Sequence, residues 1–209
     1  MLVNIRQPQA RPLVKIQPNL RKLVICAGLA FIFMIGADGG RKVKIFNKTL
    51  SDYFRFQRAI MILIIAVGLL RLVLSLAGVS DSVVKWFSLT AVAVVGIIYC
   101  AVQVPRKGFG GYKHLLPLYL LQSVTGNLII AGGIALSAIT GKENIFSRPE
   151  YSGPMASNQW IHAAGHLADG FIIGPLIGWL IGAIIMFVVL KVSRPKAVEV
   201  AAGRQYDAQ

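Results

Sequence analysis

Four apolar runs, each long enough to cross a lipid bilayer, constrain this chain more than any other feature. They are Ala59 to Gly78, Val83 to Val104, Leu115 to Ile139 and about Ile161 to Leu190. Crossing roughly 30 Å of hydrocarbon takes about 20 helical residues, with every backbone polar group satisfied inside the helix. The 56% hydrophobic content agrees with this class. The sequence therefore predicts an all-α integral membrane protein, a four-transmembrane-helix bundle.

The distribution of Lys and Arg between these runs predicts the orientation, because cytoplasmic loops of membrane proteins carry an excess of basic residues. Residues 1–58 hold 11 basic and two acidic residues. The second connection and the C-terminal tail are also basic, whereas the first and third connections are near neutral. We therefore expect both termini in the cytoplasm and a multi-pass protein of the bacterial inner membrane.

The domain organisation follows from the same runs. Residues 1–48 are predicted to be a basic N-terminal region, residues 49–191 the transmembrane domain and residues 192–209 a polar cytoplasmic tail. The N-terminal region contains an extra apolar segment, 23–37, flanked by basic pairs. A signal peptide cleaved after Ala37, or a fifth span, would place basic residues outside. We interpret the segment as interfacial or re-entrant, with translation starting at Met34 as the alternative.

Two local signals predict where the helices start and bend. Thr49 and Asp52 form a capping-box pattern ahead of the first run, so a helix is expected to begin before the membrane does. Pro175 lies inside the fourth run beside Gly174, and a proline within a helix removes a backbone donor. The fourth helix is therefore expected to kink at this position.

The fourth run carries small and imidazole residues at every fourth position. On a helix these positions lie along one side, and in lipid such small residues let another helix approach closely. The third run supplies small residues that we expect to pack against this ridge, so that spans three and four form the tightest pair. The ridge, a glycine zipper, consists of His162, His166, Gly170, Gly174, Gly178 and Gly182, and the expected partners are Gly126, Gly132, Gly133 and Ser137. Homo-oligomerisation along the ridge is the alternative.

His162, His166 and Asp169 are candidate ligands for a divalent metal ion. Histidines at positions i and i+4 direct two imidazoles toward one ion, and Asp169 follows on a neighbouring face. The run between the histidines lacks the glutamate of HExxH zinc proteases. The other interpretation is that both imidazoles hydrogen-bond to neighbouring helices, and no cofactor is assigned.

Polar residues inside the spans are expected to join helices. Arg71 and Asp169 are predicted at similar depth near the outer surface, which favours an ion pair because a buried charge needs a partner. Gln122 and Asn127 place carboxamides in the third span, where such groups usually link helices.

The net charge of +14 comes from basic residues that gather between the apolar runs. This distribution fits membrane orientation, so nucleic acid is excluded as a partner. The lipid bilayer is the expected partner, with anionic headgroups at basic loops such as 105–113. Cys26 and Cys100 provide no disulfide framework.

The histidine and glycine pattern of residues 162–182 resembles the histidine helix of rhomboid intramembrane proteases, and a histidine near an aspartate on a span is similar to CPBP-type membrane proteases. The chain lacks the GxSG motif of the first family and the EExxxR motif of the second. No catalytic residue is assigned. The sequence favours a non-catalytic helical bundle or accessory subunit of a larger membrane complex, with a metal-binding membrane protein or metalloenzyme and a small oligomeric transporter or pore as alternatives.

Overall fold

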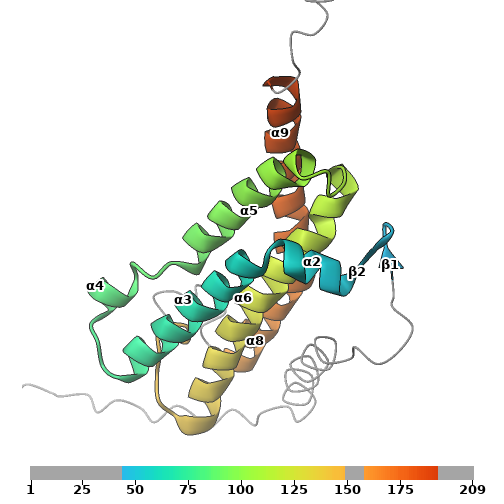
Figure 1. The fold of residues 1–209 in the computed structure, drawn as a ribbon. Helices are drawn as coiled ribbons and strands as arrows, with labels where there is room; N and C mark the ends of the chain where they lie inside the picture. Colours follow the sequence, from blue (N-terminus) through green and yellow to red (C-terminus); the bar gives the residue numbers. More distant parts are fainter. Residues whose placement is uncertain (1–43, 149–157, 193–209) are drawn as a thin grey trace, which may run out of the picture.

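The computed structural model describes residues 44–148 and 158–192. The apolar segment 23–37, Met34 and the tail after residue 192 lie outside these ranges. Within them the chain forms a short hairpin followed by helices (Figure 1). The elements are β1 (Lys44–Ile45), β2 (Lys48–Thr49), α2 (Leu50–Phe56), α3 (Arg58–Leu76), α4 (Asp81–Val84), α5 (Leu89–Arg106), α6 (Tyr112–Thr140), α8 (Gln159–Ala168), the π-helical segment η2 (Asp169–Ile173) and α9 (Gly174–Val192).

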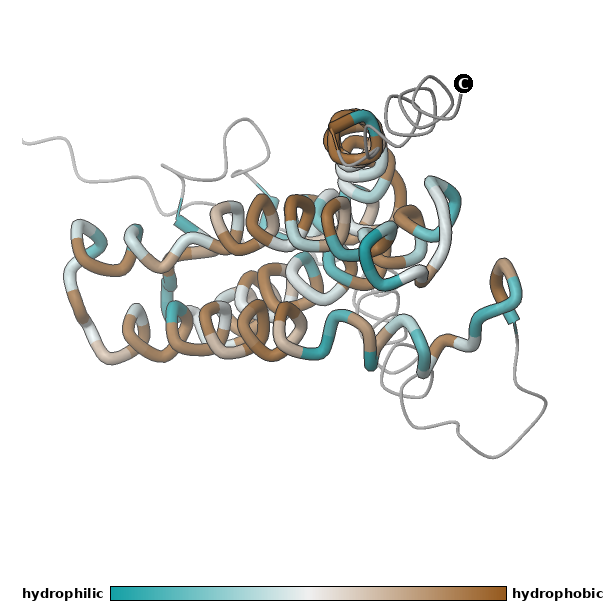
Figure 2. Tube along the Cα trace, turned by 45° about the horizontal axis from the view of Figure 1, so that its top comes forward, coloured by the Kyte–Doolittle hydropathy of each residue, from teal (hydrophilic) through white to brown (hydrophobic). Residues whose placement is uncertain are grey.

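Four helical stretches of the described residues are long and apolar enough to cross a membrane. They cover Arg58–Leu76, Asp81–Arg106, Tyr112–Thr140 and Gln159–Val192. Figure 2 shows α3 and α5 hydrophobic along most of their length, with hydrophilic residues toward the hairpin and the turns. The predicted all-helical bundle with four candidate spans is confirmed.

Helix α6 is the centre of the bundle. It contacts α3, α5, α8, η2 and α9, and its contacts with the α8–η2–α9 stretch are the most extensive in the described structure. The expectation that spans three and four pack most closely is therefore confirmed. Figure 1 places α2, the α5–α6 connection and the end of α9 at one end of the bundle, which we call the basic end because it carries Arg58, Arg106, Lys113 and Lys191. The opposite end, with the α3–α4 connection and residues 141–148, is called the loop end.

The capping box at Thr49 forms as predicted. The Thr49 amide and hydroxyl both donate to Asp52 Oδ2 at 2.8 Å, and the Asp52 amide donates to Thr49 Oγ1 at 3.2 Å. These hydrogen bonds from Thr49 lower the pKa of the Asp52 carboxyl. The capped helix α2 ends at Phe56, and Gln57, with a φ of −112°, separates it from α3. Ahead of the cap, the hairpin turn places Phe46 and Asn47 at positive φ.

The second apolar run contains a break ahead of its long helix, within the candidate span Asp81–Arg106. Residues 81–84 form the short helix α4, and the membrane helix α5 starts at Leu89. The physical reason is a second start signal, because the Ser88 hydroxyl accepts the Ala91 amide at 3.2 Å and caps α5. Trp86, in the break, is 80% exposed.

The fourth run contains a π-helical turn just before Pro175, where a kink was predicted, and the kink itself stays a prediction. The Gly174 amide donates to the Asp169 carbonyl, five residues earlier, in place of the usual four. Proline has no amide hydrogen, and its ring clashes with the carbonyl four residues before it in a regular helix. The widened turn places Pro175 at the start of α9 and makes one continuous stretch of Gln159–Val192.

Candidate functional site

The seam between α6 and the α8–η2 stretch contains a polar cluster centred on Asn127. The Asn127 carboxamide nitrogen donates to Asp169 Oδ2 at 3.2 Å and to the Ser123 carbonyl at 3.1 Å. Its oxygen is 2.9 Å from His166 Nδ1. One side chain of α6 therefore binds α8 through His166 and η2 through Asp169. We call Asn127, His166 and Asp169 the Asn127 cluster.

The hydrogen-bond pattern of the Asn127 cluster fixes the proton position on His166. Both partners of the Asn127 nitrogen are oxygens that accept, so its other carboxamide atom is the carbonyl oxygen. A carbonyl oxygen only accepts, and His166 Nδ1 must therefore carry the hydrogen that it donates. In the neutral imidazole this leaves Nε2 as the atom with an available lone pair.

His162 lies one turn before His166 on the same side of α8. The two ring centroids are 5.0 Å apart, and His162 is buried with 6% of its surface exposed. The structure thus brings the two imidazoles together. Within residues 44–148 and 158–192, no group of three His, Cys, Asp or Glu side chains is placed to hold a metal ion. The predicted set of His162, His166 and Asp169 stays a prediction.

The glycine ridge of the fourth run lies against α6. A Cβ atom at Gly170 would be 2.8 Å from Asn127 Cβ, and one at Gly178 would be 3.3 Å from Tyr119 Cβ. Added Cβ atoms at Gly174 and Gly182 would collide with the Ser123 and Tyr119 hydroxyl groups. Because 2.8 Å is shorter than real Cβ contacts, a larger residue would push the two helices apart. The ridge is therefore occupied within the chain.

The residues of α6 that meet the ridge differ from those expected. Small residues of α6 were expected there, but Asn127, Ser123 and Tyr119 fill the ridge. Gly133 packs instead against Phe146 and Leu72. A Cβ at Gly126 would come no closer than 3.9 Å to Ile64, and one at Gly132 would meet nothing within 4 Å. The physical reason is that the glycines of the ridge already provide the space, so α6 fills it with larger side chains. Ser137 accepts a hydrogen bond from Gln159 at 3.5 Å.

Tyr119 is the contact that the sequence pattern did not indicate. Its ring fills the space at Gly178 and Gly182, and its hydroxyl donates to the Ile97 carbonyl of α5 at 3.0 Å. Tyr119 is 2% exposed, so one side chain joins α5, α6 and α9 in the interior. Glycines at i and i+4 facing a neighbouring helix are a signal for a large complementary side chain, although they do not say which one.

Arg71 of α3 and Asp169 of η2 lie beside different residues of α6, at different positions along its axis. Gly68 of α3 packs against Ile129, and Leu72 packs against Gly133, so Arg71 is level with about residue 132 of α6. Asp169 is bound to Asn127, roughly five residues or about 7 Å along the helix. The Arg71 guanidinium carbon lies 5.4 Å from the Phe146 ring centre. The Arg71–Asp169 ion pair stays a prediction.

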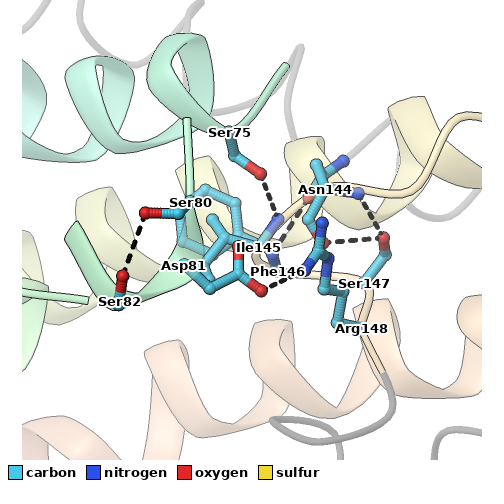
Figure 3. A network of polar contacts seen from close by, with 9 residues as sticks. All are labelled: Ser75, Ser80, Asp81, Ser82, Asn144, Ile145, Phe146, Ser147 and Arg148. Carbon is cyan, nitrogen blue, oxygen red and sulfur yellow. Dashed lines mark hydrogen bonds and ion pairs between the residues drawn. The ribbon is translucent and has the colours of Figure 1, made fainter. Parts of the chain in front are cut away.

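Residues 141–148 fold into the loop end of the bundle. Gly141 ends α6 with φ of 73°, a left-handed conformation that glycine adopts without strain. Asn144 is completely buried, and its side chain donates to the Gly133 carbonyl at 2.7 Å. The Ile145 amide donates to the Ser75 hydroxyl at 2.8 Å, and Arg148 pairs with Asp81, as Figure 3 shows. This loop therefore connects α3, α4 and α6.

A second polar cluster lies nearer the basic end, between α5, α6 and the start of α3. The Gln122 nitrogen donates to Gln57 Oε1 at 2.7 Å and is 3.3 Å from the Cys100 sulfur. The Gln57 nitrogen donates to the Leu118 carbonyl at 3.1 Å. Gln57 and Cys100 are completely buried. We call Gln57, Cys100 and Gln122 the Gln122 cluster, and sequence reasoning identified only Gln122 among them.

Comparisons with protein-family models, curated proteins and solved structures found no match to this chain.

Proposed function

We propose that this chain is a non-catalytic helical module of the bacterial inner membrane that serves as an accessory subunit of a larger membrane complex. The main support for this proposal is that the Asn127 carboxamide binds both His166 and Asp169 and so joins α6 to α8 and η2. The most polar residues of the fourth run are thereby engaged in holding helices together. This arrangement favours an architectural role over a reaction.

The outer surface of α9 supports the same proposal. Its glycine side faces α6, whereas Leu176, Leu180, Ile184 and Phe187 are each more than half exposed. An exposed apolar helix face in a bilayer contacts lipid or the helix of another subunit. The proposal retains cytoplasmic termini, a basic N-terminal region over residues 1–48 and a polar tail over 192–209.

The proposal is tested with a triple substitution of the Asn127 cluster: Asn127→Leu, His166→Leu and Asp169→Leu. Replacing all members with apolar groups removes the polar contacts without stranding a buried charge. We expect the variant to keep its fold and to co-purify with the same membrane partners at the same stoichiometry as the wild type. Gly132→Ala, where an added Cβ meets nothing within 4 Å, is the matched control.

Two results would contradict the accessory role. One is a folded triple variant that loses a solute flux or bound metal measurable in the wild type, because the cluster would then perform chemistry. The other is wild-type protein from native membranes that migrates as a single chain at every detergent concentration tested.

A metal-binding function is the second candidate, and the His166 tautomer favours it. Metal-binding histidines usually donate the hydrogen of one ring nitrogen to a protein oxygen, which directs the other nitrogen at the ion. His166 does this through Nδ1 to Asn127, with the His162 ring 5.0 Å away. Near-stoichiometric zinc, iron or copper in gently purified protein, lost in His162→Ala/His166→Ala, would support this candidate. Equal metal content in both samples would contradict it.

The oligomeric transporter or pore has less support. An oligomer along the glycine ridge would have to displace Asn127, Ser123 and Tyr119 of α6, which fill that ridge. Flux of a solute through nanodisc or vesicle preparations of the wild type is the measurement that would restore it.

A further inference from the structure

A groove at the basic end has a polar rim and an apolar floor. It lies between α2, α3 and α6 and has a volume of about 410 Å³, within the range of small-ligand sites. Its rim includes Ser51, Arg55 and Arg58, and its floor along α3 consists of Met61, Ile62 and Ile65. Phe54 of α2 and Thr125 of α6 complete the lining. The groove is distinct from both the Asn127 cluster and the Gln122 cluster.

The two arginines of the rim come from different helices. Arg55 is in the last turn of α2 and Arg58 is the first residue of α3, so they lie on the two sides of the break at Gln57. From Arg58 at the rim to Ile65 on the floor, the groove follows α3 for about 10 Å. Since α3 is a candidate membrane span, the rim lies where the hydrocarbon begins and the floor lies within it.

The rim has two arginines and one acidic residue near them, Asp52, whose carboxylate interacts with Arg55, so the charge of the rim is positive in balance. In the described part of the chain the observed ion pair is Asp81–Arg148, at the loop end, and it involves neither Arg55 nor Arg58. Asp52 is the acidic residue of α2, and its carboxylate accepts both hydrogen bonds from Thr49. The two arginines are exposed and lie at the rim.

We propose that this groove binds one anionic phospholipid. Guanidinium groups bind phosphate oxygens through paired hydrogen bonds, so Arg55 and Arg58 would hold the phosphodiester with the Ser51 hydroxyl as a further donor. An acyl chain would lie along Met61, Ile62 and Ile65. The apolar floor argues for a lipid over a soluble phosphate, because a small anion would leave it empty. Charge complementarity argues for an anionic over a zwitterionic headgroup.

The test measures lipid binding to the full-length protein. Native mass spectrometry of the detergent-solubilised chain, titrated with phosphatidylglycerol or phosphatidylcholine, reports each bound lipid separately. We expect one phosphatidylglycerol to bind at least tenfold more tightly than phosphatidylcholine. Arg55→Gln/Arg58→Gln should weaken the phosphatidylglycerol complex at least tenfold and reduce the preference between the two lipids.

The control removes the same charge at the same end of the bundle. Arg106→Gln/Lys113→Gln changes two exposed residues that do not line the groove and should alter binding less than threefold. An equal loss in both double variants would overturn the proposal, since binding would then follow overall charge. Circular dichroism and thermal melting establish that each variant is folded.

A third variant separates a lipid from a soluble anion. Ile65→Trp fills the floor and leaves both arginines in place, so we expect it to weaken phosphatidylglycerol binding at least fivefold. Glycerol 3-phosphate, the same headgroup chemistry without acyl chains, should not compete at millimolar concentration. Full competition by glycerol 3-phosphate, together with unchanged lipid binding in Ile65→Trp, would assign an anion site and overturn the lipid proposal.

Discussion

The Asn127 cluster and the Gln122 cluster lie five positions apart on α6 and satisfy their polar groups differently. Asn127 uses both its carboxamide atoms, and its partners His166 and Asp169 are ionisable. The Gln122 cluster has two carboxamides and a thiol, and Gln122 Oε1 is buried with no hydrogen-bond donor among the described residues. The first cluster is half-buried, and the second is enclosed.

The comparison shows that, within one bundle, the ionisable Asp169 lies where burial is partial, and the enclosed cluster uses carboxamides and a thiol. An ionised group in a dry interior carries a large desolvation penalty, whereas a neutral carboxamide carries a smaller one. Asp169 is accordingly placed where part of its surface stays exposed. Gln57, with no exposed surface, makes neutral hydrogen bonds to Gln122 and the Leu118 carbonyl. We infer that replacing one member of the Asn127 cluster lowers the free energy of unfolding more than replacing one member of the Gln122 cluster.

The largest effect is expected from Asn127→Leu. This change leaves Asp169 and His166 without their shared partner, and a hydrogen bond to a charged group contributes more than one between neutral groups. We expect the free energy of unfolding to fall by about 2–3 kcal/mol, measured by reversible unfolding in mixed micelles. Gly132→Ala should leave it unchanged or slightly higher. A difference between the two variants below about 0.5 kcal/mol would show that the Asn127 cluster does not stabilise the fold.

A smaller loss is expected when the glycine ridge is filled. Gly182→Val places a side chain where the Tyr119 ring lies, so the free energy of unfolding should fall by about 1–3 kcal/mol. The companion variant Gly182→Val/Tyr119→Ala vacates that space and should recover part of the loss. If the double variant loses more free energy of unfolding than Gly182→Val and Tyr119→Ala lose together, Tyr119 is not the residue that occupies the ridge.

Gln57→Leu should destabilise the Gln122 cluster by about 1–2 kcal/mol, because it removes the acceptor of the Gln122 amide. Gln57→Leu/Gln122→Leu removes both partners and should be no less stable than Gln57→Leu alone, since no buried amide is left unpaired. The same micelle unfolding assay measures both. A double variant that loses twice as much as the single one would mean that the two glutamines act independently.

The smallest effect is expected from the loss of the cap at the start of α2. Hydrogen bonds from Thr49 lower the pKa of Asp52, so the cap stabilises α2 above the ordinary aspartate pKa. This stabilisation is lost as the pH falls through the lowered pKa of the folded state. Hydrogen exchange of the Thr49 amide should therefore accelerate relative to the intrinsic rate as the pH falls below the ordinary aspartate pKa, and Asp52→Asn should remove that dependence. A wild-type amide with constant protection over this range would show that Asp52 does not hold the cap.

The sequence was sufficient for the spans and the capping box because both signals are local. A run of about 20 apolar residues has few alternatives in lipid, and Thr49 and Asp52 are only three positions apart. The break before Leu89 was missed because hydropathy averages over it, although Ser88 has a side chain that can cap a helix. The hairpin at 44–49 is too short for a strand pattern to predict.

The partners within the bundle could not be predicted, since they depend on helix register. Tyr119 and Asn127 occupy the ridge because of how α6 is rotated and shifted against α9, which no local pattern specifies. Gln57 lies just before the first apolar run, so the polar residues expected inside the spans did not include it. Asn144 and Ile145 are in a connection, yet both are buried because residues 141–148 insert between the helices.

The π-helical turn at residues 169–173 also corrects the phase of the ridge. In a regular α-helix each step of four residues rotates about 40° too far, so Gly182 would stand about 200° around the axis from His162. A single extra residue in the widened turn takes back about 100° of this drift. The turn thereby allows His166 and Gly182, on opposite sides of it, to face the same helix. Deleting one residue from this segment would leave both halves helical and direct only one of them toward α6.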